Sequence, residues 1–399
     1  MTVTERLPAM PFDRSGVLEL APAYRALQGE QPISRVRTPA GDVAWLVTGY
    51  EVVKELFTDD RLGRAHPDPE HAPRFSNSFL FLGGSVGTYE TEKADHARMR
   101  RVLTRSFMVK RMNALRPAIQ GIVDGALDRL TAMTPPVDFH AELSFLVPVL
   151  AICQLLGVPN EDRDRFGAWT QQSMHMWDRE KAAEGHRLLA AYMHGLIQRK
   201  REAPAEDVIS DLLAAQHEED RFTEQDMIQL CVALLMAGHE TTVARIDLGT
   251  LLLLTHPDQL DALRRDPGLA TGAVEEILRM AAPTLGVIAR YAVAEIEVGG
   301  VAIAPGDLVL ISTDTANRDD AAFAEPDRFD IRRAPNQHVA FGHGLRFCIG
   351  AGLARVELQT VFSTLFQRVP TLRLAVGLDE LRLRDDTPLG GLTRLPVTW

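Results

Sequence analysis

Cys348 lies in a segment that glycine interrupts at Gly342, Gly344 and Gly350. Glycine permits tight turns and a close approach of the backbone to a flat ligand, and the sequence predicts a helix just after the cysteine. Peptide N–H groups at a helix amino terminus favour a thiolate, and a thiolate with one open face suits iron. Arg346 could pair with an anionic group at the rim of such a ligand, and a haem propionate would fit. A buried structural cysteine is the alternative.

A second group of polar residues, at positions 237–242, interrupts a long apolar run. The Thr241 hydroxyl can donate back to the carbonyl of Ala237, and Gly238 weakens the same helical turn. We therefore expect a local groove, which beside an iron atom could hold dioxygen and water. From these six residues alone, a packing kink with an exposed Glu240 is an equal alternative.

Three helices must position these residues. The longest is predicted from about Thr223 to Leu254, where Thr223 and Asp226 form a capping box, and some 32 residues would span about 48 Å. A second is predicted over Thr271–Met280, and a third runs from just after Cys348 to about Val369. We expect one domain over residues 1–399, mainly α with small β-sheets, helix-rich at about 94–280 and 349–399 and β-rich at about 33–48 and 287–312.

Composition narrows the class of protein further. The chain has 399 residues, 46% hydrophobic and 24% charged, and a formal net charge of −11, which is the wrong sign for a general nucleic-acid binder. Three widely spaced cysteines build neither a disulfide framework nor a four-cysteine zinc site. No signal peptide or membrane anchor is predicted, so we expect a cytoplasmic protein.

The cysteine segment and residues 237–242 together resemble motifs of the cytochrome P450 family of thiolate-haem monooxygenases. A third match is the E-x-x-R motif at Glu276 and Arg279, for which the resemblance makes Arg328 the expected partner in a structural cluster. The resemblance extends from about Pro32 to the end of the chain. It implies the P450 fold, with haem b held between the long helix and the helix that follows the cysteine.

The resemblance also implies a set of haem contacts. His96 and Arg100 match the propionate-binding helix, Arg290 matches a propionate ligand on a strand, and Phe107 matches an aromatic residue beside the haem. Cys348 is the expected iron ligand. The full expected haem set is His96, Arg100, Phe107, Ala237, Thr241, Arg290, Phe341, Gly342, Arg346, Cys348 and Gly350.

The activity implied is insertion of one oxygen atom from O2 into an apolar substrate, with Glu240 and Thr241 steering protons. Electrons would come from NAD(P)H indirectly, through a ferredoxin reductase and a ferredoxin. The strip Arg98–Arg111 has six basic and no acidic residues, and we expect it to dock the ferredoxin on a monomeric enzyme. The alternatives are a haem-thiolate ligand sensor, which would need no proton relay, and a peroxide-driven oxygenase.

Substrate contacts are expected from family position. They comprise apolar residues of the long helix and of the strand before Arg290, a carboxyl-terminal leucine, and an aromatic lid with Phe75, Phe79 and Phe81. A bulky secondary metabolite such as a polyketide, macrolide or terpenoid is expected, and the type of oxidation stays open. The expected pocket residues are Phe81, Trp177, Ala233, Met236, Ala237, Val287, Ile288 and Leu392.

Overall fold

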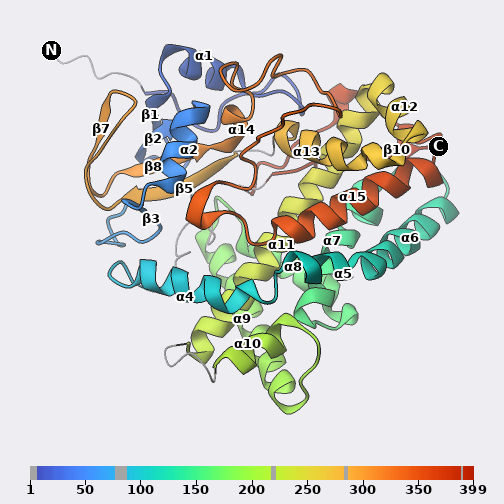
Figure 1. Ribbon diagram of the computed structural model, residues 1–399, viewed down its shortest axis with the longest axis horizontal. Coiled ribbons are helices and arrows are strands. Elements are labelled where there is room, and N and C mark those ends of the chain that lie inside the picture. The colour runs from blue at the N-terminus through green and yellow to red at the C-terminus, as the bar shows by residue number, and fades with distance from the viewer. Residues whose placement is uncertain (1–6, 77–87, 217–221, 283–285, 388–389) are drawn as a thin grey trace.

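The computed structural model describes residues 7–76, 88–216, 222–282, 286–387 and 390–399. Helices dominate, and they gather below and to the right of a sheet in Figure 1. The helices are α1 (Pro22–Glu30), α2 (Tyr50–Thr58), α4 (Glu92–Thr104), α5 (Val109–Ala114), α6 (Arg116–Ala132), α7 (Leu146–Leu156), α8 (Arg163–Ser173), α9 (Arg179–Glu202), α10 (Val208–Gln216), α11 (Glu224–Thr255), α12 (Pro257–Arg265), α13 (Ala270–Met280), α14 (Thr313–Ala316) and α15 (Ala351–Arg368).

The largest sheet has the strand order β1-β2-β8-β5-β3, with β2 and β8 parallel and the other pairs antiparallel. Every residue of its central strand β8 is buried, because the sheet is covered on both faces. Small sheets β4-β10-β9 and β6-β7 complete the fold. The strands are β1 (Ile33–Arg37), β2 (Val43–Val47), β3 (Leu62–Gly63), β4 (Val137–Asp138), β5 (Val287–Ala292), β6 (Ile296–Val298), β7 (Val301–Ile303), β8 (Leu308–Ser312), β9 (Arg373–Leu374) and β10 (Pro396–Thr398).

Helix α11 passes through the middle of the molecule (Figure 1) and begins at the predicted capping box of Thr223 and Asp226. It continues as an α-helix through Gly238, the residue at which the sequence predicted a weakened turn. Glycine is needed for packing instead, because a Cβ at position 238 would lie 2.9 Å from Cδ1 of Ile152 on α7. Among the described helices, α11 alone is long and apolar enough to cross a membrane, and 72% of its apolar window is buried inside the protein.

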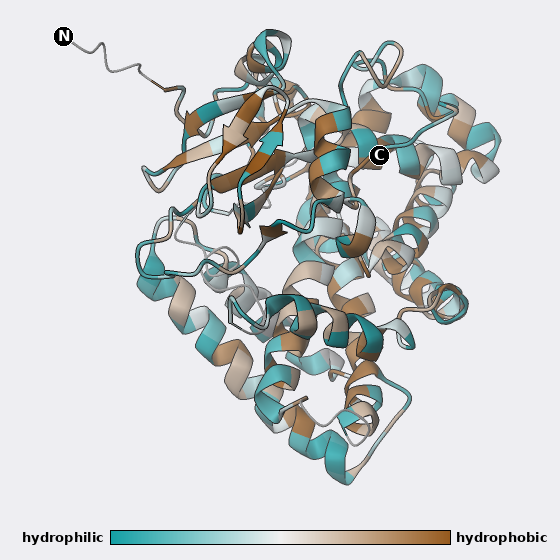
Figure 2. Ribbon diagram, turned by 60° about the vertical axis from the view of Figure 1, so that its left-hand side comes forward, coloured by the Kyte–Doolittle hydropathy of each residue, from teal (hydrophilic) through white to brown (hydrophobic). Residues whose placement is uncertain are grey.

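Apolar packing around α11 forms the main core, in which α6, α7, α13 and α15 take part. A separate cluster lies between the large sheet and α2. In Figure 2 hydrophobic residues are concentrated on the strands of the sheet, while hydrophilic residues alternate with them along the outer helices. The observed α13 and α15 lie within two residues of the predicted helix limits. The short strands β3, β4, β9 and β10 lie outside the predicted β-rich parts, since two or three residues leave too weak a pattern.

Candidate active site

The segment before α15 holds Cys348 in a tight loop. The Cys348 N–H donates to the carbonyl of Phe341 at 2.9 Å, and its carbonyl accepts from Ala351 in the first turn of α15. Gly342 and Gly344 have φ of 72° and 68°, which favours glycine as predicted. Gly350 has an ordinary φ of −80°, and a Cβ there would lie 3.9 Å from the Cys348 sulfur, an ordinary contact, so neither its φ nor the space around it requires glycine.

The pKa of the Cys348 thiol differs from the sequence-based prediction, which was a thiolate favoured by the start of a helix. Backbone N–H groups of Gly350 and Ala351 and the charges of Arg100 and Arg355 lower its pKa, as expected at a helix start. Burial acts in the opposite direction and dominates, so the net pKa is raised above the ordinary value. Cys348 nonetheless reaches open space, whereas Cys153 and Cys231 are buried. A bound cation would hold the thiolate, because metal ligation deprotonates a coordinating thiol.

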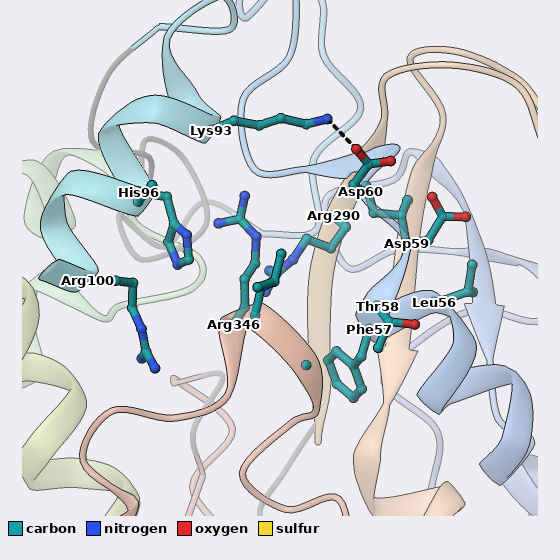
Figure 3. A pocket seen from close by; sticks show the side chains of 14 residues that line it. Leu56, Phe57, Thr58, Asp59, Asp60, Lys93, His96, Arg100, Arg290 and Arg346 are labelled. Carbon is teal, nitrogen blue, oxygen red and sulfur yellow. Dashed lines mark hydrogen bonds and ion pairs between the residues drawn. The ribbon is translucent and has the colours of Figure 1, made fainter. Parts of the chain in front are cut away.

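A pocket beside the cysteine loop gathers basic side chains from three separate elements. His96 and Arg100 come from α4, Arg290 from β5, and Arg346 from the loop before Cys348. Figure 3 shows the side chains of His96 and Arg346 facing each other, with Arg290 close by. The structure therefore brings together the four expected propionate contacts. One carboxylate, that of Glu92, pairs with Arg346.

The pKa values show a surplus of positive charge in this pocket. Burial, followed by the charges of Arg346 and Arg100, lowers the pKa of His96 to about 4. Burial, followed by the charges of Arg64 and Arg346, lowers the pKa of Arg290 to about 9, although Glu92 opposes the shift. Asp59 and Asp60 also line the pocket, but they pair with Arg61 and Lys93. Among the described residues no carboxylate forms an ion pair with His96, Arg100 or Arg290, so the pocket suits a ligand with further anionic groups. The two propionates of haem, beside a reachable thiol and small glycines, fit these residues.

The described part of α11 is buried on all sides but one. From Met227 to Leu253 the residues that are not buried recur every fourth position, with Gly238 as one addition, and this spacing defines one helix face. We call this face the open stripe of α11. Its members are Gln229, Ala233, Ala237, Gly238, Thr241 and Arg245.

Thr241 lies on the open stripe, and its hydroxyl donates to the carbonyl of Ala237 at 2.7 Å, as the sequence predicts. Glu240 does not lie on the stripe. It is 4% exposed, and its Oε2 accepts from Nη1 of Arg384 at 3.3 Å. The other oxygen, Oε1, has no hydrogen-bond partner among the described residues. Glu240, the acid predicted to steer protons, is therefore held by Arg384, a residue near the carboxyl terminus. It lies one residue before Thr241 on the helix.

The E-x-x-R motif forms a fully buried cluster. Arg279 donates from Nε and Nη2 to the two Glu276 oxygens at 2.8 and 2.7 Å. The expected partner Arg328 was wrong, because its side chain is 58% exposed and pairs with Glu325. Arg333 takes that place, and its Nε lies 3.1 Å from Glu276 Oε1. The second cation of the cluster therefore comes from five positions further along the chain than expected.

The expected pocket residues separate into several groups. Ala233 and Ala237 lie on the open stripe, and Val287 and Ile288 are half-buried on β5. Met236 and Leu392 were wrong as open contacts, because they are 3% and 0% exposed and pack in the core. Trp177 is exposed and donates from Nε1 to the carbonyl of Asp385 at 3.0 Å.

Phe75 was predicted as part of an aromatic lid, and this was wrong. It is 1% exposed and packs in a core cluster. Phe79 and Phe81 lie outside the described residues. On the other side of the cysteine loop, Phe107 lines a second pocket together with Cys348, as the expected aromatic neighbour should. Phe341 is half-buried, and the Arg355 guanidinium lies 4.6 Å from its ring centroid.

Sequence reasoning missed four charged residues of the site. Most of them lie far in sequence from the groups they affect, so no local spacing indicates these contacts. Glu92 does lie four residues before His96 on one helix face, which is the one available signal. The missed residues are Glu92, Arg245, Arg333 and Arg384.

This fold combines a reachable thiol, a basic pocket and a threonine on the long helix. These are the parts of a haem-thiolate monooxygenase. Residues 169–267 and 268–372 match the sequence profile of the family described as Cytochrome P450. The chain belongs to the cytochrome P450 family. Its cofactor is haem iron, and electrons derived from NAD(P)H reach it through a redox partner.

The chain is similar along nearly its whole length to bacterial members of the family. It is 42% identical to pentalenolactone synthase of Streptomyces exfoliatus, over 98% of this chain and 99% of that protein. It is 39% identical to the mycinamicin IV hydroxylase/epoxidase of Micromonospora griseorubida, over 98% of each. The crystal structure of PimD, a polyene macrolide antibiotic pimaricin epoxidase, matches with a TM-score of 0.89 and 40% identity, over 98% of this chain and 99% of that one.

Proposed function

We propose that this enzyme oxidises a bulky apolar secondary metabolite, such as a polyketide, macrolide or terpenoid, with electrons from a ferredoxin and its reductase. The observation that carries the proposal is the placement of a reachable Cys348 thiol beside a cationic pocket that suits two propionates. The names of the similar proteins support the substrate class, since they include pentalenolactone synthase, a mycinamicin IV hydroxylase/epoxidase and a polyene macrolide antibiotic epoxidase. We further propose that the protein acts as a cytoplasmic monomer.

Each residue of the site has a physical role in this proposal. Cys348 would ligate the iron, and Arg100, Arg290 and Arg346, together with His96, would hold the propionates. When bound, haem supplies the redox chemistry of oxygen activation, which the thiolate favours. The protein supplies position and charge around it.

Proton delivery is assigned to Thr241 and Glu240. Because its own proton is directed to the Ala237 carbonyl, the Thr241 hydroxyl presents its lone pairs on the open stripe and can accept a hydrogen bond from water there. Glu240 is the nearest acid along the helix, and Arg384 positions its carboxylate away from the stripe. We assign Glu240 to move protons from the Arg384 side of α11 toward Thr241.

The threonine role predicts a specific loss of coupling. Thr241→Val keeps the side-chain shape but removes the hydroxyl, so product formed per NADPH oxidised should fall roughly tenfold to a hundredfold. Thr242→Val is the matched control, because Thr242 is buried off the stripe and its hydroxyl lies 3.5 Å from the Gly238 carbonyl. Product and NADPH are measured in the same reaction. Equal losses in the two variants would remove Thr241 from proton delivery.

The expected ferredoxin surface adjoins the second pocket, whose lining includes Arg100, Met108 and Phe347. Arg98 and Arg111 of the basic strip already pair with Asp95 and Asp211, so the strip offers less free charge than its sequence suggests. Exposed apolar side chains lie among the basic ones, and such a centre with a charged rim is typical of a docking face. The exposed apolar residues are Met108, Val109, Leu345 and Phe347.

Charge reversal tests this surface. Arg105→Glu together with Lys110→Glu should lower the rate of reduction by an acidic ferredoxin about tenfold at low ionic strength, and less at high salt, because steering is screened. The control is Arg179→Glu with Lys181→Glu on α9, two exposed cations on another helix. The rate of reduction by the ferredoxin is measured by stopped-flow spectroscopy for both double variants. An unchanged rate and salt dependence in the first variant would refute the docking proposal.

The function itself is tested by reconstitution. Spectral titration against a library of natural products identifies a substrate, and the enzyme is then supplied with ferredoxin, ferredoxin reductase and NADPH under labelled dioxygen. The expected product carries one labelled oxygen atom. Binding without any product under electron supply would contradict the monooxygenase proposal and support a ligand sensor.

A further inference from the structure

Arg245 is a charged residue on the open stripe of α11, one helical turn beyond Thr241. A largely buried guanidinium in the middle of a helix is costly unless its donors are satisfied. The proton-delivery and haem-binding roles assigned above do not use it. Its surroundings therefore show what else the site can bind.

The guanidinium of Arg245 lacks a hydrogen-bond acceptor in the part of the chain that the structure describes. Its Nη1 is fully covered and makes no hydrogen bond there. Burial lowers the pKa of Arg245, and the carboxylate of Asp314 opposes that shift by long-range attraction rather than by a direct ion pair. A charged donor group that is buried and unsatisfied favours the arrival of an acceptor.

The charges around Arg245 leave a surplus of positive charge. Asp314 on α14 is 5% exposed, and the guanidinium groups of Arg245, Arg14 and Arg318 all act on it. Arg318 is engaged elsewhere, with Asp327 at 3.2 Å and the Met280 carbonyl at 2.7 Å. Arg14 and Arg245 thus share one carboxylate, which leaves one cation in excess.

This cluster is separate from the propionate pocket. The carboxylate of Asp314 lies against Gly286, just before β5 begins, because a Cβ at Gly286 would lie 2.0 Å from its Oδ2. Arg290 lies four residues further along that strand, so the backbone positions beside the two charge clusters are separated by about 13 Å of strand. Between them lie Val287 and Ile288, the strand residues assigned to the substrate pocket.

We propose that Arg245 binds a carboxylate of the substrate and so selects apolar molecules that carry one acidic group. This inference rests on the proposed function and names the substrate class more closely. The carboxylate would accept charge-assisted hydrogen bonds from the guanidinium, and the surplus cation would become neutralised. Asp314 competes with the substrate carboxylate for the charge of Arg245, so it sets the strength of acid binding.

The test is a spectral binding titration of the haem-loaded enzyme. The probes are polycyclic and macrocyclic monocarboxylic acids, abietic acid among them, each compared with its own methyl ester. The enzyme should bind at least one acid of the panel roughly tenfold to a hundredfold more tightly than its ester. Arg245→Met, which keeps length and removes charge, should abolish that preference.

Two further variants control the test. Ile246→Met introduces the same residue one position along, where the helix is buried, and should keep the preference for acid. Asp314→Asn removes the competing charge and should tighten acid binding severalfold without tightening ester binding. Opposite effects at positions 245 and 314 would not follow from a loss of fold.

The inference is wrong if no acid of the panel binds more tightly than its ester, or if the preference survives in Arg245→Met. Either result leaves the proposed function intact when the reduced enzyme still gives the carbon monoxide spectrum of thiolate-bound haem and still forms product. Loss of that spectrum in the native protein would instead overturn the proposed function. The two failures are therefore distinguished in the same preparation.

Discussion

Glu276→Gln is expected to lower the free energy of unfolding by about 3–5 kcal/mol, because the substitution leaves buried guanidinium groups without their counter-charge. The Glu276 and Arg279 side chains are both 0% exposed. Arg279 also donates to the carbonyls of Asn317 and Pro326, so the cluster ties α13 to the segment that leads to the cysteine loop. We expect haem content after purification to fall together with stability.

Denaturant unfolding at neutral pH measures this loss, and the two arginines provide a matched pair. Arg333→Gln should cost about 1–3 kcal/mol, since it removes a charged hydrogen bond to buried Glu276. Arg328→Gln should cost less than about 0.5 kcal/mol, because its exposed ion pair with Glu325 contributes little. A larger effect at Arg328 than at Arg333 would contradict the assignment of the cluster.

Cys348→Ser is expected to abolish electron-supported turnover while the protein remains folded. The serine hydroxyl nearly matches the shape of the thiol, and the loop is held by the hydrogen bond from Cys348 N–H to the Phe341 carbonyl, which does not involve the sulfur. A hydroxyl remains protonated where a metal-bound thiol does not, so the electron donation that favours oxygen cleavage is lost.

The control for this variant is Cys231→Ala. Cys231 is buried in α11, and burial raises the pKa of its thiol to about 12, which makes it inert. The Cys231→Ala variant should therefore keep turnover with the same redox partners. Product formation and haem content are measured for both variants. Turnover by Cys348→Ser at the native rate would contradict iron ligation by Cys348.

The features of the fold and the site that depend on residues close together in the sequence were predictable. The capping box located the start of α11, and the left-handed glycines of the cysteine loop follow from the residue type. Thr241 hydrogen-bonds to Ala237 because four residues separate them on one helix. Such contacts depend on spacings of a few residues, which a sequence displays directly.

The rest depends on packing between distant segments. Met236 was predicted to line the pocket, although only positions in step with Ala233, Ala237 and Thr241 belong to the open face of α11. Glu240 meets Arg384 from 144 positions away, and no local pattern indicates that contact. The raised pKa of Cys348 likewise comes from burial, which the loop sequence alone does not reveal.

The most direct test of the account is the carbon monoxide difference spectrum of the dithionite-reduced, haem-loaded protein, recorded for the native chain and for Cys348→Ser. The native protein should show the long-wavelength absorption of thiolate-bound ferrous haem, and the variant should lack it although its haem remains bound. The same long-wavelength band in both proteins would show that the iron is ligated by some other group, and this assignment of the site would then be wrong.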